Sequence, residues 1–450
     1  MHMAKGGSLS LNTKKGKVCE ALRNPIDVLN SLKSKAGNEG YHYERLYRNL
    51  YNEEFYLLAY QNIYASEGNM TAGADGKTID GMGMDRIRKL IEKVKDHSYQ
   101  PNPARRTYIE KKNGKKRPLG IPSFDDKLVQ EVVRLILESI YEPTFSNLSH
   151  GFRPNRSCHT ALQQIQGTFT GVKWFIEGDI CGFFDNIDHT VLINILRRRI
   201  HDEYFIALLW KFLKAGYMED WTFHNTYSGT PQGSIISPIM SNVYLNELDR
   251  YMEIYMKEFE CGKKRQKSEE YARWEQKLKY LRYKLYAKDK WADMTAEERK
   301  AANDRIHAIR SEMLKCEYSN PQDSGYRRLF YVRYADDWLC GVTGSKQDAE
   351  EIKADIKRFL SETLKLELSE EKTLITNARD MAHFLSYDIF VSDNESLRED
   401  KNGYTRRARS GKVKLYVPVK NGRKSSWIIR LSKSGIKTER NYLILSTEPI

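Results

Sequence analysis

Two short apolar runs lie close together in the second half of the chain. Residues 329–332 and 338–342 flank a polar interval in which Asp336 and Asp337 are adjacent. Apolar runs of this length around a short polar interval predict a strand, a tight turn and a second strand. The turn of an apolar hairpin would therefore carry two neighbouring carboxylates.

A third apolar run ends in another acidic residue. Residues 173–180 have the pattern of a strand with Asp179 near its end, and an amphipathic stretch, residues 190–216, follows. Its helical periodicity predicts a helix, which Asp188 or Asn186 would cap. Asp179 differs from Asp188 because it lies where a strand ends and not where a helix begins.

The rest of the pattern mixes helices and strands, which predicts an α+β protein. Amphipathic helices are expected in residues 43–64, 85–97, 126–141 and 348–364, a hairpin in 105–121, and short strands in 412–419 and 427–429. Residues 261–310 combine many charges with few β-formers, which favours exposed helices. Residues 1–40 are polar, and we expect them to be loosely ordered.

Charge is concentrated at the two ends of the chain. The 450 residues carry a net charge of +14, and residues 401–450 alone hold 13 Lys/Arg against two Glu, a net charge of +11. Residues 1–40 add a net charge of +4. Such basic ends favour a polyanionic partner, with salt-sensitive binding. The alternative is a basic tail that serves only solubility.

Cysteine usage and hydropathy limit the other functional classes. The six cysteines, at positions 19, 158, 181, 261, 316 and 340, form no CxxC pair, so a zinc cluster is not expected. Unpatterned cysteines suit a reducing interior. No segment has the pattern of a signal peptide or a membrane span, and we expect a cytoplasmic, nucleic-acid-associated protein without membrane contact.

The three aspartates have a chemistry in common. Adjacent carboxylates oppose each other's ionisation unless a cation lies between them, and Mg²⁺ prefers oxygen ligands. Asp179, Asp336 and Asp337 carry three negative charges, which two Mg²⁺ ions would more than balance. Paired metals are how polymerases transfer nucleotides. Taken alone, an adjacent pair such as Asp336-Asp337 is far more often a solvated turn, and Asp179 could simply end its strand.

Several motifs occur in an order that resembles the reverse transcriptases. They are residues 175–189, Ser228-Gly229-Thr230-Pro231-Gln232-Gly233 with Ser237-Pro238, and Tyr334-Ala335-Asp336-Asp337. Six further runs resemble the reverse transcriptases encoded by bacterial group II introns: residues 105–109, 117–122, 150–157, 212–217, 368–373 and 384–388. The resemblance covers about residues 43–388. It implies a right-hand polymerase with fingers and palm, the palm being an antiparallel sheet backed by helices.

The resemblance also implies a domain organisation. Residues 1–40 would be a basic flexible N-terminus and 41–171 the N-terminal extension and fingers. The palm would span 172–392 with a helical insertion at about 251–327, and 393–450 would be a basic segment leading toward a thumb. No complete thumb, DNA-binding region or His/Cys-rich nuclease is evident in the sequence, which suits both a trimmed and a naturally short chain. We therefore expect weak processivity.

The resemblance implies roles for the acidic residues and for the residues around the nucleotide. Asp179, Asp336 and Asp337 would bind two Mg²⁺ ions, with the Ile180 carbonyl completing a metal shell. The residues of the nucleotide site would be Lys111, Arg117, Phe184, Gln232 and Lys372. Among these, Lys111 and Arg117 would grip the triphosphate, Phe184 would exclude a ribose 2′-hydroxyl, and Lys372 would protonate pyrophosphate.

Each of these residues also has a plainer interpretation. Lys111 and Arg117 could belong to a solvated basic turn, Phe184 to the core, and Lys372 to the surface. The helical insertion could contact intron RNA or be a solvated helical hairpin.

The template and primer would lie against a third group of residues, namely Arg153, Arg156, Gly233 and Tyr334. Glycine at 233 would let backbone approach the nucleic acid closely. Two positions depart from the family pattern: Ser234 and Ser386 replace glycines, which bears on primer and template positioning and not on the chemistry.

The sequence therefore predicts an RNA-directed DNA polymerase that also assists splicing and mobility of its intron. Its partners would be intron RNA, an RNA template with a DNA primer, dNTPs and a DNA target, and a homodimer is compatible with this prediction. The alternatives are a splicing-only RNA-binding maturase, and a reverse transcriptase adapted to defence or spacer acquisition. The presence of all three aspartates favours catalysis.

Overall fold

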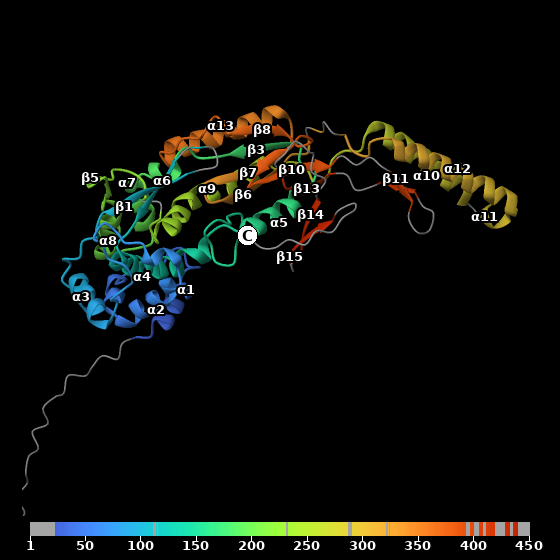
Figure 1. Ribbon diagram of the computed structural model, residues 1–450. Helices are drawn as coiled ribbons and strands as arrows, with labels where there is room; N and C mark the ends of the chain where they lie inside the picture. Colours follow the sequence, from blue (N-terminus) through green and yellow to red (C-terminus); the bar gives the residue numbers. More distant parts are fainter. Residues whose placement is uncertain are drawn as a thin grey trace, which may run out of the picture.

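The computed structural model describes residues 23–110, 114, 116–230, 233–286, 290–320, 323, 325–392, 397–399, 405–407, 411–418, 428–432 and 435–439. A four-stranded sheet forms the centre of the molecule. A helix-rich region lies at one end of it, and a pair of long helices projects from the other (Figure 1).

The central sheet is antiparallel throughout, in the order β6-β7-β3-β8. Its strands are β3 (Trp174–Gly178), β6 (Arg328–Tyr334), β7 (Asp337–Thr343) and β8 (Leu374–Asn377). The predicted hairpin of two apolar strands is confirmed as β6 and β7, and the predicted third strand is confirmed as β3.

Both faces of this sheet are buried, which explains why its strands are almost continuously apolar. One face contributes Ile176, Tyr331 and Cys340 to a core shared with α9 (Ser237–Phe259) and α13 (Lys346–Thr363). The other contributes Phe175, Val332 and Leu339 to a core shared with α5 (Cys158–Thr168). The alternation follows the two-residue period of a strand.

A second sheet, ordered β2-β1-β4-β5, belongs to the helix-rich end. It contains β1 (Ala104–Glu110), β2 (Lys116–Ile121), β4 (Tyr217–Glu219) and β5 (Thr222–His224), and the β1–β4 pairing is parallel. The helical elements here are α1 (Pro25–Ser34), η1 (Tyr47–Tyr51), α2 (Glu53–Tyr64), η2 (Glu67–Met70), α3 (Met84–Lys95), α4 (Phe124–Tyr141) and η3 (Glu142–Thr144), with α6 (Phe183–Asn186), α7 (His189–Arg197) and α8 (Glu203–Leu213) beside them.

Two predictions about helices need correction. Part of the N-terminal 40 residues, expected to be loosely ordered, forms α1, which Asn24 caps and in which Pro25 is buried. The stretch expected as one helix in residues 190–216 is divided into α7 and α8, because Asp202 caps a new helix by accepting a hydrogen bond from the Phe205 amide. Asp188 caps α7 as predicted.

The insertion forms a helical arm, as its composition indicates. Its helices are α10 (Glu269–Tyr286), α11 (Lys290–Asp293) and α12 (Ala296–Lys315), and α10 and α12 lie side by side at the far end of Figure 1. Leu278, Leu285, Ala302 and Ile306 form a small core of their own. At its root, reciprocal backbone hydrogen bonds of 3.1 Å join Cys261 to Arg327.

The remaining strands follow the central sheet in the chain. A three-stranded sheet contains β9 (Ala382–Phe384), β10 (Tyr387–Ser392) and β13 (Lys412–Tyr416), and two pairs are β11 (Leu397–Glu399) with β12 (Thr405–Arg407) and β14 (Ile428–Ser432) with β15 (Gly435–Glu439). Strands predicted at 412–419 and 427–429 correspond to β13 and β14. Residues 419 and 427 themselves lie outside the described residues.

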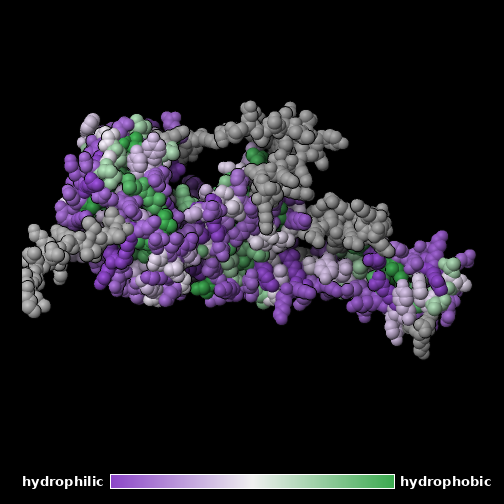
Figure 2. All heavy atoms as spheres, turned by 90° about the horizontal axis from the view of Figure 1, so that it is seen from below, coloured by the Kyte–Doolittle hydropathy of each residue, from purple (hydrophilic) through white to green (hydrophobic). Residues whose placement is uncertain are grey.

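The face seen in Figure 2 is predominantly hydrophilic, and its hydrophobic residues are scattered between polar ones. Within the described ranges, the search for a helix both long and apolar enough to cross a membrane finds none.

Candidate active site

The two adjacent aspartates lie at the turn between β6 and β7. Tyr334 pairs with Asp337 across the hairpin, and Ala335 takes a φ of 56° in the two-residue loop. On the other side of β7, Gly178 pairs with Trp338. Because these strands are antiparallel, the next pair in register brings Asp179 beside Asp337. The three carboxylates predicted from separate runs therefore meet at one end of the sheet.

Burial and nearby negative charge raise the pKa values of the Asp336 and Asp337 carboxyls. Burial raises the pKa of Asp336, and the negative charge of Asp179 adds to the effect. Burial, then the charges of Asp336 and Asp179 and a hydrogen bond with Asp179, raise the pKa of Asp337 to about 7. Nearby positive charge does not cancel this effect at Asp337, and the oxygen donors of the site are of the kind that Mg²⁺ prefers.

A lysine supplies one positive charge next to the carboxylates. Lys372 Nζ lies 2.5 Å from Asp179 Oδ2, and the hydrogen bond to Asp179 raises the pKa of Lys372. Backbone hydrogen bonds hold the segment before Lys372 against the end of β3. The Ser369 amide donates to the Asp179 carbonyl, and the Cys181 amide donates to the Glu367 carbonyl. Among the described residues, no three His, Cys, Asp or Glu side chains are close enough to form a ready-made metal site.

A cavity of about 540 Å³ opens beside the pair of Asp179 and Asp337. Its other lining residues include Lys372, Cys158, His383 and Ser386. The reacting groups of a bound substrate could therefore reach the carboxylates from this side.

The turn is held from beneath by a buried ion pair that the sequence analysis missed. Arg333, 1% exposed, binds both carboxylate oxygens of Asp249 at 2.7 and 2.6 Å and donates to the Ala335 carbonyl at 2.7 Å. Ser149 Oγ accepts a further bond from the same guanidinium. The sequence did contain a sign of this pair: Arg333 and Asp249 each lie within a largely apolar segment, and charged side chains are rarely buried unless they are paired.

Comparison with known proteins then decides the family. A family described as "Reverse transcriptase (RNA-dependent DNA polymerase)" matches residues 109–281. The Group II intron-encoded protein LtrA of Lactococcus lactis subsp. cremoris is 43% identical over 413 residues, which is 90% of this chain and 67% of LtrA. Protein YkfC of Escherichia coli K12 is 35% identical over 77% of this chain and 83% of its own length. Nuclear intron maturase 1 of Arabidopsis thaliana is 24% identical over 60% of this chain and 40% of its own.

The chain belongs to the group II intron-encoded reverse transcriptases. It is an RNA-directed DNA polymerase, and its reverse transcriptase domain has a right-hand polymerase fold. Its central sheet has Asp179, Asp336 and Asp337 together at one end.

In this reverse transcriptase, Phe184 lies at a second cavity, of about 310 Å³. Phe184 is 9% exposed and contacts Phe152 edge-on, with ring centroids 6.1 Å apart. Arg106 and Tyr217 line the same cavity, and the guanidinium of Arg106 lies over the Tyr217 ring at 3.8 Å. Phe184 is thus both a core residue and a wall of a cavity.

The residues expected to grip the nucleotide are only partly described. Lys111 and Gln232 lie outside the described residues. Arg117 lies on β2, and its positive charge lowers the pKa of Asp336 against the dominant effect of burial. Gly233 takes a φ of 107°, and a Cβ there would meet the Gly120 carbonyl of β2 at 2.5 Å. A larger residue would therefore push these two segments apart.

The template and primer residues differ in their surroundings. Arg153 is buried, with its guanidinium bound to Glu142 and to the Ser146 and Ser149 carbonyls. It stabilises its loop and is not a surface residue. Arg156 is half-buried and donates to Asn147.

Two further predicted residues lie next to the carboxylates. Tyr334 is half-buried beside the hairpin turn, and burial raises its pKa. The side chain of Ile180 is buried, and its backbone forms a bridge with Leu368.

Proposed function

We propose that this reverse transcriptase extends a DNA primer on intron RNA by two-metal nucleotidyl transfer. We also propose that it binds the same RNA to assist splicing and mobility. The observation that carries the proposal is the register of β3 against β7, which brings Asp179 beside Asp337 at the hairpin turn. Nucleotidyl transfer requires carboxylates grouped in this way.

The acidic residues would hold two Mg²⁺ ions. Asp179, Asp336 and Asp337 supply the carboxylates, and the Ile180 carbonyl supplies a further oxygen. When bound, the metals would activate the primer 3′-hydroxyl and stabilise the charge of the leaving pyrophosphate. The raised pKa of Asp337 supports this assignment, because a carboxylate that resists ionisation in isolation gains most from a nearby cation.

The basic residues would orient the incoming dNTP. Lys111 and Arg117 bind its phosphates, Phe184 limits the space at the ribose 2′-position, and Gln232 lies under the base. The Lys372 ammonium donates a proton to the departing pyrophosphate. Its contact of 2.5 Å with Asp179 supports this role, because it keeps the amine protonated at the place where negative charge develops.

The nucleic acid would cross the site over Arg156, Gly233 and Tyr334. We leave Arg153 out of this surface because its guanidinium is consumed by Glu142 and two carbonyls. Residues 41–171 would act as fingers and 172–392 as palm, with a DNA target and an RNA template as the macromolecular substrates.

The test is primer extension on an RNA template with Mg²⁺, comparing wild type with Asp336→Asn and Asp337→Asn. We expect each variant to lose extension while retaining affinity for intron RNA. Asp380→Asn is the matched control, because Asp380 is an exposed aspartate in the turn after β8. Splicing assays on the same variants separate the two activities. Splicing by a wild-type protein that makes no DNA would instead favour a splicing-only maturase.

A further inference from the structure

A cavity of about 780 Å³ lies at the opposite end of the central sheet from the carboxylates. β7 begins at Asp337 in the active site and ends at Thr343 in the wall of this cavity. Seven strand residues span roughly 20 Å at about 3.3 Å each. This distance makes the cavity a site separate from the carboxylates. We call it the junction cavity because it lies where the helical arm joins the palm.

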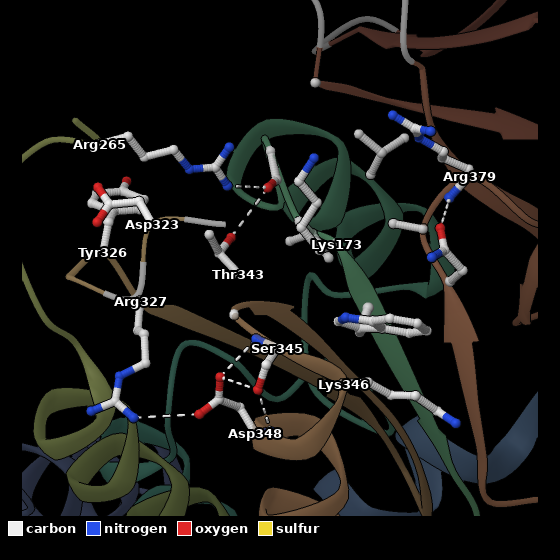
Figure 3. A pocket seen from close by; sticks show the side chains of 18 of the residues that line it. Lys173, Arg265, Asp323, Tyr326, Arg327, Thr343, Ser345, Lys346, Asp348 and Arg379 are labelled. Atoms are coloured by element: carbon white, nitrogen blue, oxygen red, sulfur yellow. Dashed lines mark hydrogen bonds and ion pairs between the residues drawn. The ribbon is translucent and has the colours of Figure 1, made fainter. Parts of the chain in front are cut away.

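Cationic side chains from separate segments surround the junction cavity. They are Lys173 before β3, Arg265 and Arg327 from the two ends of the arm, Lys346 at the start of α13, and Arg379 after β8. Figure 3 shows them on different sides of the hollow. Two carboxylates, Asp323 and Asp348, also line it. The seven side chains together carry a net charge of +3.

Both carboxylates already serve the backbone. Asp348 Oδ2 accepts from the Ser345 amide at 2.7 Å and from its hydroxyl at 2.8 Å, which caps α13. Asp323 accepts from the amides of Gln266 at 2.7 Å and Gly325 at 3.0 Å. These bonds hold the two carboxylates in the walls without neutralising them. The net charge of +3 from the lining side chains makes the potential inside the cavity positive.

The cations are held in place by other contacts. Arg265 donates to the Gly171 carbonyl at 3.1 Å and lies over the Tyr326 ring at 5.5 Å. Arg327 pairs with Asp348 at 3.3 Å. Such contacts fix the guanidinium planes before a ligand arrives, which reduces the entropy lost on binding.

We propose that the junction cavity binds the phosphodiester backbone of a structured RNA. Five cations spread over five segments suit several spaced phosphates better than one small anion. The arm carries further cations: α10 contains Lys277, Lys279 and Lys284, and its Tyr280 and Tyr283 are exposed. Basic residues interleaved with aromatic ones suit RNA. The proposal rests on the proposed function, to which it adds an RNA contact remote from the chemistry.

The test uses a fully base-paired RNA hairpin as the probe and the double variant Arg265→Gln/Lys346→Gln. Removing two phosphate contacts should weaken binding by roughly tenfold and reduce the slope of log Kd against log salt by about 2. Lys89→Gln removes one positive charge from an exposed position on α3 and is the control. Primer extension on poly(rA)–oligo(dT) should be unchanged in all variants, since the carboxylates are untouched.

A second measurement does not depend on the variants. RNA should slow acetylation of Lys346 in the wild-type protein, while Lys89 should react as in the free protein. Affinity and salt slope of the double variant equal to those of Lys89→Gln would overturn the proposal. So would loss of pyrophosphate binding with unchanged RNA binding, which would make the cavity a small-anion site. A wild-type protein that fails to extend the primer would refute the proposed function, and hairpin binding would still report on the cavity.

Discussion

At the scale of single residues, the active site depends on close approach as much as on charge. A Cβ on Gly178 would meet the Trp338 ring at 2.0 Å, and one on Gly151 would meet the Ala335 amide nitrogen at 2.2 Å. Gly178 immediately precedes Asp179, and Trp338 immediately follows Asp337. The positions of the carboxylates are therefore set by neighbours that have no room to move.

Replacing Gly178 with alanine should disrupt this packing. Trp338 is completely buried, so its ring can yield only by shifting β7 and with it Asp337. We expect a loss of about 1–3 kcal/mol in the free energy of unfolding, as for other overpacked cores, and a large fall in the primer-extension rate. Gly167→Ala is the control: its Cβ would have open space in α5, and alanine favours a helix. Equal behaviour of the two variants would contradict the packing argument.

His150 should make the fold sensitive to acid. Its ring contacts Thr160 and Gln164, and burial lowers its pKa to about 4, helped by the charges of Arg156 and Arg153. The folded state therefore keeps the ring neutral, and the stability it contributes is present above about pH 6.5 and falls as the pH drops toward 4.

As the pH falls from about 7 to 5, protonation linked to His150 should lower the free energy of unfolding by about 2 kcal/mol, as measured by urea titration. His150→Gln should be less stable at neutral pH but lose less on acidification. His307→Gln, an exposed change on α12, should keep the wild-type pH profile. If His150→Gln still lost stability steeply on acidification, the pH dependence would come from other groups.

The candidate site shows what residue patterns can and cannot predict. Local pattern predicted that Asp336 and Asp337 lie in a hairpin turn and that Asp179 lies near the end of a strand. The register of β3 against β7, which brings the three together, is a tertiary feature that no local pattern contains. The burial of Arg153 was not predictable in this way, because it depends on how the loop folds back onto Glu142 and the carbonyls around it. Side-chain partners of this kind are set by tertiary packing, on which the periodicity of a sequence carries no information.

At the scale of elements, the sheet and the α9 helix are joined by the pair of Arg333 and Asp249. Both side chains are at most 1% exposed, so each charge depends on the other for solvation. The pair also connects to the hairpin turn through the Ala335 carbonyl. One ion pair thus holds a strand, a helix and the turn that carries Asp336 and Asp337.

Asp249→Asn should therefore lower the free energy of unfolding by about 3–5 kcal/mol, because it leaves a buried guanidinium without a counter-charge. Primer extension should fall with it, because the Arg333 contact to the turn loses its anchor. Glu203→Gln breaks the exposed pair with Arg197 and should cost no more than about 1 kcal/mol. Denaturant unfolding of the two variants gives the comparison, and a small effect at Asp249 would show that the turn is held by other contacts.

Elements were predicted well where periodicity was strong and long. The helices α3, α4 and α13 and the β6–β7 hairpin arise from local apolar patterns. The division between α7 and α8 was missed because the Asp202 cap interrupts a stretch whose apolar spacing continues on both sides. The α1 helix was missed because only ten residues are helical, and its burial depends on contacts with α4 and α2.

At the scale of the whole molecule, the central sheet and the helical arm are structurally separable. The arm has its own core, and its two ends meet at the reciprocal hydrogen bonds of Cys261 and Arg327. Composition predicted its helices, but only the folded chain shows that they leave the palm and return at one point. That arrangement makes the arm a removable module whose root contributes Arg265, Asp323, Tyr326 and Arg327 to the junction cavity.

Replacing residues 262–326 with Asn-Gly should remove the arm and leave the palm intact. Cys261 and Arg327 already form the hydrogen-bonded pair that a two-residue hairpin turn closes, and Asn-Gly favours that turn. We expect wild-type primer extension on poly(rA)–oligo(dT) and roughly tenfold or greater loss of affinity for the RNA hairpin, because Arg265 and the α10 cations are gone. Replacing Lys277, Lys279 and Lys284 with Gln in the intact chain separates the arm surface from the cavity. Loss of extension in a shortened protein that still unfolds cooperatively would show that the arm shapes the active site, contrary to the two-part organisation argued from its core and its closed root.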